Sequence, residues 1–483
     1  MKHLFCHAIS KNNRHNAPSV KPENNTAAKV LALGFGLFLG LCIWKFGDPV
    51  ILDAKIGAPT TGTEFLNEAW PTHWARYVLF PLAAAGLLLI FQNRAAIRSC
   101  WLWLLPLLWL GWQFVSATAT VDADLTADAL WQFAGCVTCY FLGALLFARR
   151  QLLRWVLPGV LAAFTFCLVR AVDQRVFEFP SNYQVLVEGE QCGWTNFPPA
   201  TVMEMKAADV IITTNGVDAA NPVVLAKFAK GRVAGTLVYP NALAEIILLL
   251  WPVSLVLAVG ATRQLRPVVR LTAIALTVFL GGAAFFWTGS KLGWLIGLVL
   301  AGLVLLRLNW PGKLKLAAVA GMLVLGLGVF TVRFHHYFAT GATSAGARLD
   351  YWRAAVQTTA AQPMLGTGPG TFQRPYFRLK SPASEMARLA HNDFLEQFSD
   401  SGIPGGVAYS AWIVLAMVWA GRKFWSQNDA FSFAIYLGLL GWFLQELGEF
   451  GLYIPALAWT VFTLMGCLIR LSENEFDKKP FIG

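Results

Sequence analysis

Long runs of apolar residues, each about as long as a membrane is thick, recur along most of the chain. A helix needs about 20 mostly apolar residues to cross the hydrocarbon core of a bilayer. The runs lie near residues 30–46, 75–91, 101–116, 129–148, 152–170, 239–260, 271–288, 291–307, 315–331, 404–420, 431–447 and 454–470. This pattern predicts an all-α integral membrane protein with about twelve transmembrane helices.

Two polar stretches are too long to be simple turns between spans. Residues 171–238 separate the fifth and sixth spans, and residues 332–403 separate the ninth and tenth. We expect short helices in both, including one near 346–361 and an amphipathic one from His391 to Asp400 that lies along the membrane surface and stops at Gly402. The predicted organisation is a tail (1–29), a membrane domain (30–470) with the two loops inserted, and a second tail (471–483).

Composition and charge support this architecture and add an orientation. Only 13% of the residues are charged and 56% are hydrophobic, whereas soluble proteins carry about 25% charged residues. An even number of spans places both termini on one side, and the segments of that side hold 21 of the 38 Lys and Arg residues. Because basic residues collect in cytoplasmic loops, we predict cytoplasmic termini and two external loops. The net charge of +11 then needs no nucleic-acid partner.

The second external loop concentrates ionisable side chains. Arginine offers a planar fork of donors that suits phosphate, and histidine can transfer a proton near neutral pH. Arg348 and Trp352 are four residues apart on the predicted helix and therefore share a face. His391, followed by Asn392, stands at the start of the second helix, where it acts either as a catalyst or as a hydrogen-bonding residue at the helix terminus.

Other candidates lie at the external ends of the spans. Arg232 precedes a Gly-Thr turn, Asn241 either caps the sixth span or lines the mouth of a site, and Lys291 stands at the membrane surface. For Lys291 the alternative is an anchor whose ammonium reaches the membrane–water interface.

A pair of carboxylates follows the eleventh span. Glu446 and Glu449 are three residues apart and share a helix face. They are candidates for holding Arg348 or orienting His391, because a catalytic base is commonly fixed by a third group. The alternative is a pair of solvated surface carboxylates.

Several other functions have weaker support. The GTGPG segment at 366–370 lacks the Lys-Ser/Thr of a phosphate-binding P-loop, so nucleotide binding is weakly supported. A permease is disfavoured because no repeat and no matched pair of mid-membrane ionisable groups is visible; Glu245 is the clearest single one. Cys192 is alone in the external loops, which excludes a disulfide within them.

Five segments, in this order among the spans, carry a family resemblance: GTLVYPNALAE, TGSKLGW, RLDYWRAA, PMLGTGPGTF and AHNDFLEQFSDSGIPGG. Together they resemble the bacterial O-antigen ligase/polymerase superfamily of inner-membrane glycosyltransferases, over roughly residues 230–420. The resemblance implies a periplasmic reaction on a glycan carried by undecaprenyl pyrophosphate. It places the essential histidine at His391 and one arginine at Arg348. A second family arginine falls on Lys291, which keeps the charge but loses the fork, so pyrophosphate binding there is looser or carried by Arg232.

The reaction implied by the resemblance has clear chemical needs. Fixed cations stabilise the departing pyrophosphate, and a positioned base activates the acceptor hydroxyl. Neither a cofactor nor a metal is needed if arginines do this work. A competing scheme uses a divalent metal on Asp48 or Asp53. The acceptor is a lipid A core, a glycan or a protein, so polymerase and protein O-oligosaccharyltransferase stay open as alternatives. A binding or export protein for lipid-linked glycan is a third.

Overall fold

The computed structural model describes residues 26–92, 101–214, 216–339, 343–382 and 384–473. Most of the two predicted tails, residues 1–25 and 474–483, lies outside these ranges. So do Arg94 and Arg98, two of the basic residues on which the predicted orientation rests.

Helices cover all twelve apolar runs in the described part of the chain. They are α1 (Thr26–Lys45), α3 (His73–Gln92), α4 (Leu104–Ser116), α5 (Ala123–Leu142), α6 (Arg150–Asp173), α10 (Pro240–Ala261), α11 (Pro267–Thr288), α12 (Lys291–Arg307), α13 (Gly312–Ala339), α16 (Asp393–Ser426), α17 (Ala430–Gln445) and α18 (Pro455–Glu473). Nine helices among the described residues are long and apolar enough to cross a membrane. Two shorter apolar helices in the described ranges correspond to α4, together with the turn after it, and to α17. The all-α membrane fold is confirmed, and the count of twelve spans stays a prediction.

The helix boundaries follow from local sequence. Pro240 and Pro267 open α10 and α11, where proline fits because the first N–H groups of a helix have no internal partner. Asp122 and Asp429 cap α5 and α17 by accepting hydrogen bonds from backbone N–H groups in the first turn. Gly289, in the left-handed region at φ 59°, ends α11.

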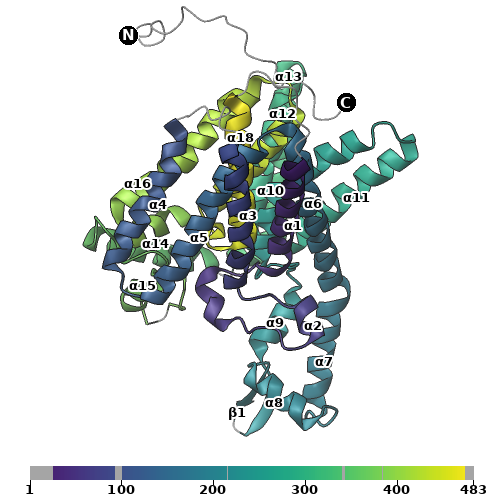
Figure 1. The fold of residues 1–483 in the computed structure, drawn as a ribbon. Helices are drawn as coiled ribbons and strands as arrows, with labels where there is room; N and C mark the ends of the chain where they lie inside the picture. The colour runs from purple at the N-terminus through teal and green to yellow at the C-terminus, as the bar shows by residue number, and fades with distance from the viewer. Residues whose placement is uncertain (1–25, 93–100, 215, 340–342, 383, 474–483) are drawn as a thin grey trace, which may run out of the picture.

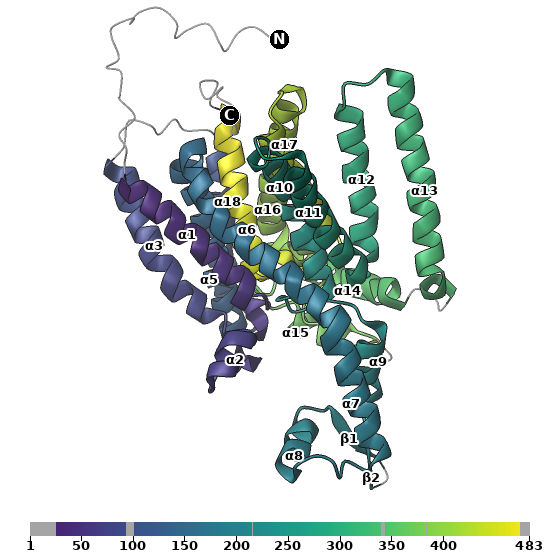
Figure 2. The same cartoon turned by 90° about the vertical axis from the view of Figure 1, so that its right-hand side faces the viewer.

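The bundle is built by close helix packing around α18, whose membrane segment is 94% buried. Helices α1 and α6 lie side by side (Figure 2) because small residues face each other. A Cβ atom on Gly36 would lie 2.1 Å from the Val156 carbonyl oxygen, so only glycine permits this approach. Such small-residue contacts are typical of membrane helices.

The first long loop is a small folded unit that projects from one end of the bundle (Figure 1). It contains η6 (Gln174–Glu178), α7 (Phe179–Gln191), α8 (Pro199–Ala207), β1 (Ile211–Thr214), β2 (Val217–Ala220) and α9 (Pro222–Lys230). The helix of α6 runs on through a π turn into α7, so the predicted boundary at residue 171 is not a break. Strands β1 and β2 pair antiparallel, with Ile211 opposite Ala220; this hairpin was not predicted.

The second long loop contains α14 (Thr343–Ala361), α15 (Gln373–Leu379) and the first part of α16. The remaining short elements are η1 (Val50–Lys55), α2 (Gly62–Asn67), η3 (Trp101–Trp103), η4 (Ala117–Ala119), η5 (Gly143–Phe147) and η7 (Gly451–Tyr453). We call the end of the bundle that carries both long loops the loop end. The opposite end carries the turns α12–α13 and α16–α17 (Figure 2), and we call it the turn end.

Candidate functional site

The carboxylate of Glu449 lies at the centre of the candidate site. Glu449 belongs to the segment between α17 and α18, and only 1% of its side chain is exposed. Its oxygens accept hydrogen bonds from the Arg348 guanidinium at 2.5 Å, from the Tyr239 hydroxyl at 2.7 Å and from the Asn241 amide at 2.7 Å. The Nδ1 atom of His391 lies 3.5 Å away. One buried carboxylate therefore contacts side chains from three segments that are distant from it in the sequence.

The surroundings of Glu449 keep it ionised despite its burial. Burial raises the pKa of its carboxyl, but the contacts with His391 and Tyr239 and the charge of Arg348 outweigh burial and bring the pKa below its ordinary value. Burial and the nearby Glu449 charge raise the pKa of Tyr239, so its hydroxyl stays protonated and donates. A charged, hydrogen-bonded Glu449 can thus fix the positions of Arg348 and His391.

His391 is held in an unusual backbone conformation between aromatic rings. Its φ of 51° lies in the left-handed region, which costs energy for a residue with a side chain. The Tyr351 ring stacks on the imidazole at 5.7 Å, and the Phe450 ring meets it edge-on at 4.7 Å. The indole N–H of Trp352 donates to the His391 carbonyl at 3.4 Å. The prediction that Arg348 and Trp352 share a face of α14 is consistent with both side chains reaching this site.

Asn392, rather than His391, caps the helix that follows. Its side-chain oxygen accepts a hydrogen bond from the Leu395 N–H, and its amide donates to the Leu447 carbonyl at 3.0 Å. The Asp393 N–H donates to the Glu446 carbonyl at 3.1 Å. These bonds tie the start of α16 to the segment after α17, which brings His391 beside Glu449. The hydrogen-bonding role at the helix terminus, which was the alternative predicted for His391, is therefore performed by Asn392.

Two further cationic side chains, Arg232 and Lys291, lie near Arg348. Arg232 donates to the Thr288 carbonyl at 2.7 Å and to the Asn241 side chain at 2.9 Å. Burial lowers the pKa of Arg232, an effect that Glu449 opposes and Arg348 adds to. The Lys291 ammonium lies 3.9 Å from the centre of the Tyr337 ring, within the field of Arg232 and Arg348. With Arg348 this makes three cations and one carboxylate, a surplus of positive charge suited to an anionic ligand.

A cavity of about 310 Å³ has His391 in its lining. Its lining includes Tyr351, Glu385, Arg388 and Phe450 together with Ile51 of η1. The Tyr351 hydroxyl donates to the Glu385 carboxylate at 2.6 Å, which fixes the ring that stacks on His391. Sequence reasoning missed Tyr239, Tyr351 and Phe450 as site residues, although Tyr239 and Tyr351 lie within the segments GTLVYPNALAE and RLDYWRAA that carry the family resemblance.

The GTGPG segment holds a break in α16 in place and supplies no phosphate-binding loop. Gly402 has φ 68° and interrupts the helix, as predicted for a stop, and a Cβ there would lie 2.2 Å from the Met364 carbonyl oxygen. The N–H groups of Gly368 and Ile403 donate to the carbonyls of Asp400 and Pro363 at 2.9 and 2.7 Å. The turn therefore fixes the direction of the short helix that begins beside His391.

That short helix differs from the prediction of an amphipathic surface helix. Its acidic residues Asp393, Glu396 and Asp400 are fully buried inside the bundle. Each accepts a hydrogen bond from a backbone N–H, supplied by Leu452, Ala390 and Gly370 respectively. The helix packs its polar side into protein because backbone donors of η7, of the GTGPG segment and of the residue before His391 lie there.

Glu446 and Glu449 do not act as a pair. Both are fully buried, so neither is a solvated surface carboxylate. Glu449 contacts Arg348 and His391, whereas Glu446 accepts a hydrogen bond from the Gly451 N–H at 2.8 Å. Glu446 therefore stabilises the chain turn after α17, and its predicted contact with Arg348 or His391 is not found.

The two residues of the competing metal scheme have different surroundings: Asp48 precedes Pro49, which lines the cavity beside His391, and Asp53 contacts Thr72 and His73. Asp53 accepts hydrogen bonds from the Thr72 hydroxyl at 2.7 Å and from the His73 ring at 2.6 Å. Burial raises the pKa of the Asp48 carboxyl. Within the described residues, no group of three or more His, Cys, Asp or Glu side chains is arranged to hold a metal ion.

Residues 276–410 match the family model described as O-antigen ligase. The matched region begins within α11 and contains Lys291, Arg348, His391 and Asn392, but ends before Glu449. A search of curated proteins found no match to the chain. The family match confirms the resemblance of this region to the O-antigen ligase superfamily.

Proposed function

We propose that this protein transfers a glycan from undecaprenyl pyrophosphate to an acceptor hydroxyl at the loop end of the bundle. This end faces the periplasm in the proposed orientation, with both termini on the cytoplasmic side of a bacterial inner membrane. The observation that carries the proposal is the contact of Glu449 with both Arg348 and His391. It places a fixed cation and a potential base on either side of one buried carboxylate.

The cationic side of the cluster binds the pyrophosphate of the donor. Arg348 presents a guanidinium that can hold two phosphate oxygens at once, and Lys291 and Arg232 add two further charges. Because Arg348 is already oriented by Glu449, little reorganisation is needed when negative charge develops on the departing pyrophosphate. Asn241 accepts a hydrogen bond from Arg232 and donates one to Glu449, so it positions these two side chains relative to each other.

The opposite side of the imidazole serves the acceptor. Nδ1 of His391 faces Glu449 at 3.5 Å; we assign the ring proton to Nδ1, so Nε2 is the basic nitrogen. Nε2 accepts the proton of the acceptor hydroxyl while the hydroxyl oxygen bonds to the anomeric carbon. The bond from that carbon to the phosphate oxygen breaks, and undecaprenyl pyrophosphate leaves with the electron pair. Asn392 and Trp352 hold the backbone of His391, and the 310 Å³ cavity is the proposed approach for the acceptor.

The test is a reaction with purified components. The full chain, purified in detergent, is incubated with lipid-linked glycan and candidate acceptors, and new glycosidic bonds are measured by mass spectrometry. We expect transfer without added metal. Absence of any new bond with every acceptor class, alongside movement of donor across vesicles, would contradict the proposal and favour a binding or export protein.

A deletion strain identifies the acceptor. Long glycan chains that are no longer attached to the lipid A core indicate a ligase, which is the assignment we favour from the family match. Chains of single repeats indicate a polymerase, and unchanged polysaccharide with unglycosylated protein indicates a protein O-oligosaccharyltransferase.

A further inference from the structure

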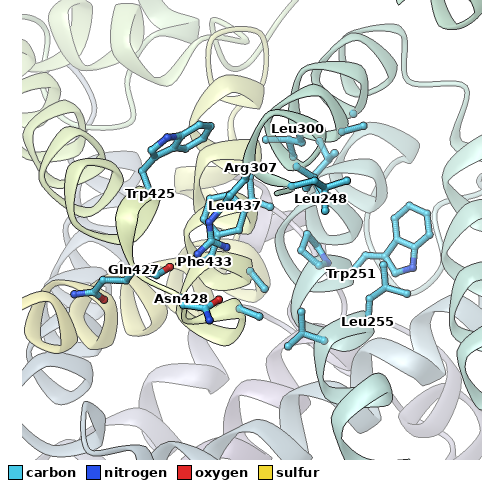
Figure 3. A pocket seen from close by; sticks show the side chains of 18 of the residues that line it. Leu248, Trp251, Leu255, Leu300, Arg307, Trp425, Gln427, Asn428, Phe433 and Leu437 are labelled. Carbon is cyan, nitrogen blue, oxygen red and sulfur yellow. Dashed lines mark hydrogen bonds between the residues drawn. The ribbon is translucent and has the colours of Figure 1, made fainter. Parts of the chain in front are cut away.

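A large apolar pocket lies toward the turn end of the bundle, away from His391. It has a volume of about 710 Å³ and is formed by residues of α10, α11, α12 and α17 and by the α16–α17 turn. This volume falls within the range of about 300–1,000 Å³ that is usual for ligand sites. Figure 3 shows Trp251 and Leu255 on one side of the pocket and Phe433 and Leu437 facing them.

The polar groups of this pocket are gathered at one end. Arg307, Asn309 and the turn residues Ser426, Gln427 and Asn428 form that end, and the remaining lining is almost entirely hydrophobic. An apolar channel with a polar mouth matches a molecule that has a hydrocarbon chain and a polar headgroup. In a membrane protein such a molecule is a lipid.

Arg307 gives the mouth a positive charge. Its guanidinium donates to the Gln427 carbonyl and lies 3.8 Å from the centre of the Phe433 ring (Figure 3). Among the described residues no carboxylate forms an ion pair with Arg307; the nearby Asp429 pairs with Arg150 instead. A guanidinium stacked on a ring is held in a fixed orientation, and several of its N–H groups remain able to bind a phosphate.

The charge around the mouth favours an anionic headgroup over a zwitterionic one. The three neighbouring segments 261–270, 307–315 and 422–430 contain a single acidic residue, Asp429. Their basic residues are Arg263, Arg266, Arg270, Arg307, Lys313, Lys315, Arg422 and Lys423. Basic residues near a membrane surface attract anionic lipids.

We infer that this pocket binds one anionic phospholipid, with an acyl chain among the apolar side chains and the phosphate at Arg307. The site is separate from the proposed transfer reaction and does not rest on it. Because the lipid joins α10 and α12 to α17, its binding stabilises the contact of these helices. Helices α10 and α17 lead to Asn241 and Glu449 at the loop end.

The experiment uses the full chain purified in detergent and depleted of lipid. Phosphatidylglycerol or phosphatidylcholine with identical acyl chains is added, and lipid binding is measured by native mass spectrometry together with the unfolding temperature. We expect one tightly bound phosphatidylglycerol and a higher unfolding temperature with that lipid than with phosphatidylcholine. Arg307→Gln should weaken phosphatidylglycerol binding about tenfold, whereas Arg154→Gln, which changes an exposed arginine of α6 outside the pocket lining and outside the three basic segments, should not.

A second variant tests the apolar part. Ala301→Trp places a large side chain in the pocket and should abolish lipid binding. This variant tests the inference independently, should Arg307→Gln fail to fold. Equal binding of both phospholipids would overturn the inference, because the pocket would then be filled by any acyl chain. Displacement of phosphatidylglycerol by undecaprenyl phosphate at equimolar concentration would overturn it as well, in favour of a site for the polyprenyl chain.

Discussion

Arg348 donates a hydrogen bond to the buried carboxylate of Glu449, which lies 101 residues further along the chain. The same carboxylate faces Nδ1 of His391 at 3.5 Å. Removing one member of a buried ion pair leaves the other charge uncompensated, which typically costs about 3–5 kcal/mol. The arrangement therefore ties the stability of the loop end to the geometry of the proposed reaction.

Glu449→Gln keeps the shape of this side chain and removes its charge. We expect transfer per mole of folded protein to fall at least about 100-fold, because both the cation and the base lose their orienting partner. Glu446→Gln is the matched control, since Glu446 is equally buried but bonds to the Gly451 N–H. Similar activity in the two variants would show that Glu449 has no special role.

Arg348→Lys tests the guanidinium fork. We expect severe loss of transfer and weaker donor binding, because an ammonium cannot hold two phosphate oxygens in a fixed plane. Arg353→Lys is the control on the same helix, where 70% of the side chain is exposed. Binding of lipid-linked donor and turnover are both measured; normal values for Arg348→Lys would remove Arg348 from the pyrophosphate site.

The ionisation of Glu449 predicts a dependence of stability on acid. Its folded-state pKa is below the ordinary value because its partners outweigh the effect of burial. The stabilisation is therefore fully present above the unfolded pKa of about 4.3 and is lost as the pH falls through the lower folded pKa. Thermal unfolding between pH 7 and pH 3 should show this loss in the wild type. The Glu449→Gln variant should lack that component, and identical pH profiles would contradict the assignment.

Gly402→Ala tests the break in α16. The left-handed backbone at φ 68° and the nearby Met364 carbonyl leave no room for a methyl group, so we expect a loss of at least about 1–3 kcal/mol. Gly328→Ala on α13 is the control, because nothing lies within 4 Å of its added methyl group. Unfolding temperatures of the two variants in the same detergent give the comparison, and equal values would mean that the break tolerates a side chain.

The parts of the site that depend on a local sequence pattern could be predicted from the sequence. Hydrophobic runs placed the helices, and ordered motifs singled out Arg348 and His391, because spacing along one helix is readable from one segment. The sequence could not show that Glu449, and not Glu446, contacts Arg348 and His391, because this depends on where α14 and α16 meet the turn after α17. The burial of Asp393 was missed for the same reason: its hydrogen-bond donor, the Leu452 N–H, comes from a segment 59 residues away.

His391→Ala is the most direct test of the proposed base. If Nε2 accepts the proton of the acceptor, the variant should lose about 10²–10⁴-fold in turnover and retain donor binding. A purely structural histidine predicts a loss of stability of about 1 kcal/mol, as for a helix cap, without loss of specific activity. His335→Ala, which alters an exposed histidine of the same loop, should behave as the wild type. The assays use purified, folded protein with a chelator present. Near-normal turnover of His391→Ala would remove the general base, and loss of wild-type activity only with chelator would move the chemistry to Asp48 or Asp53.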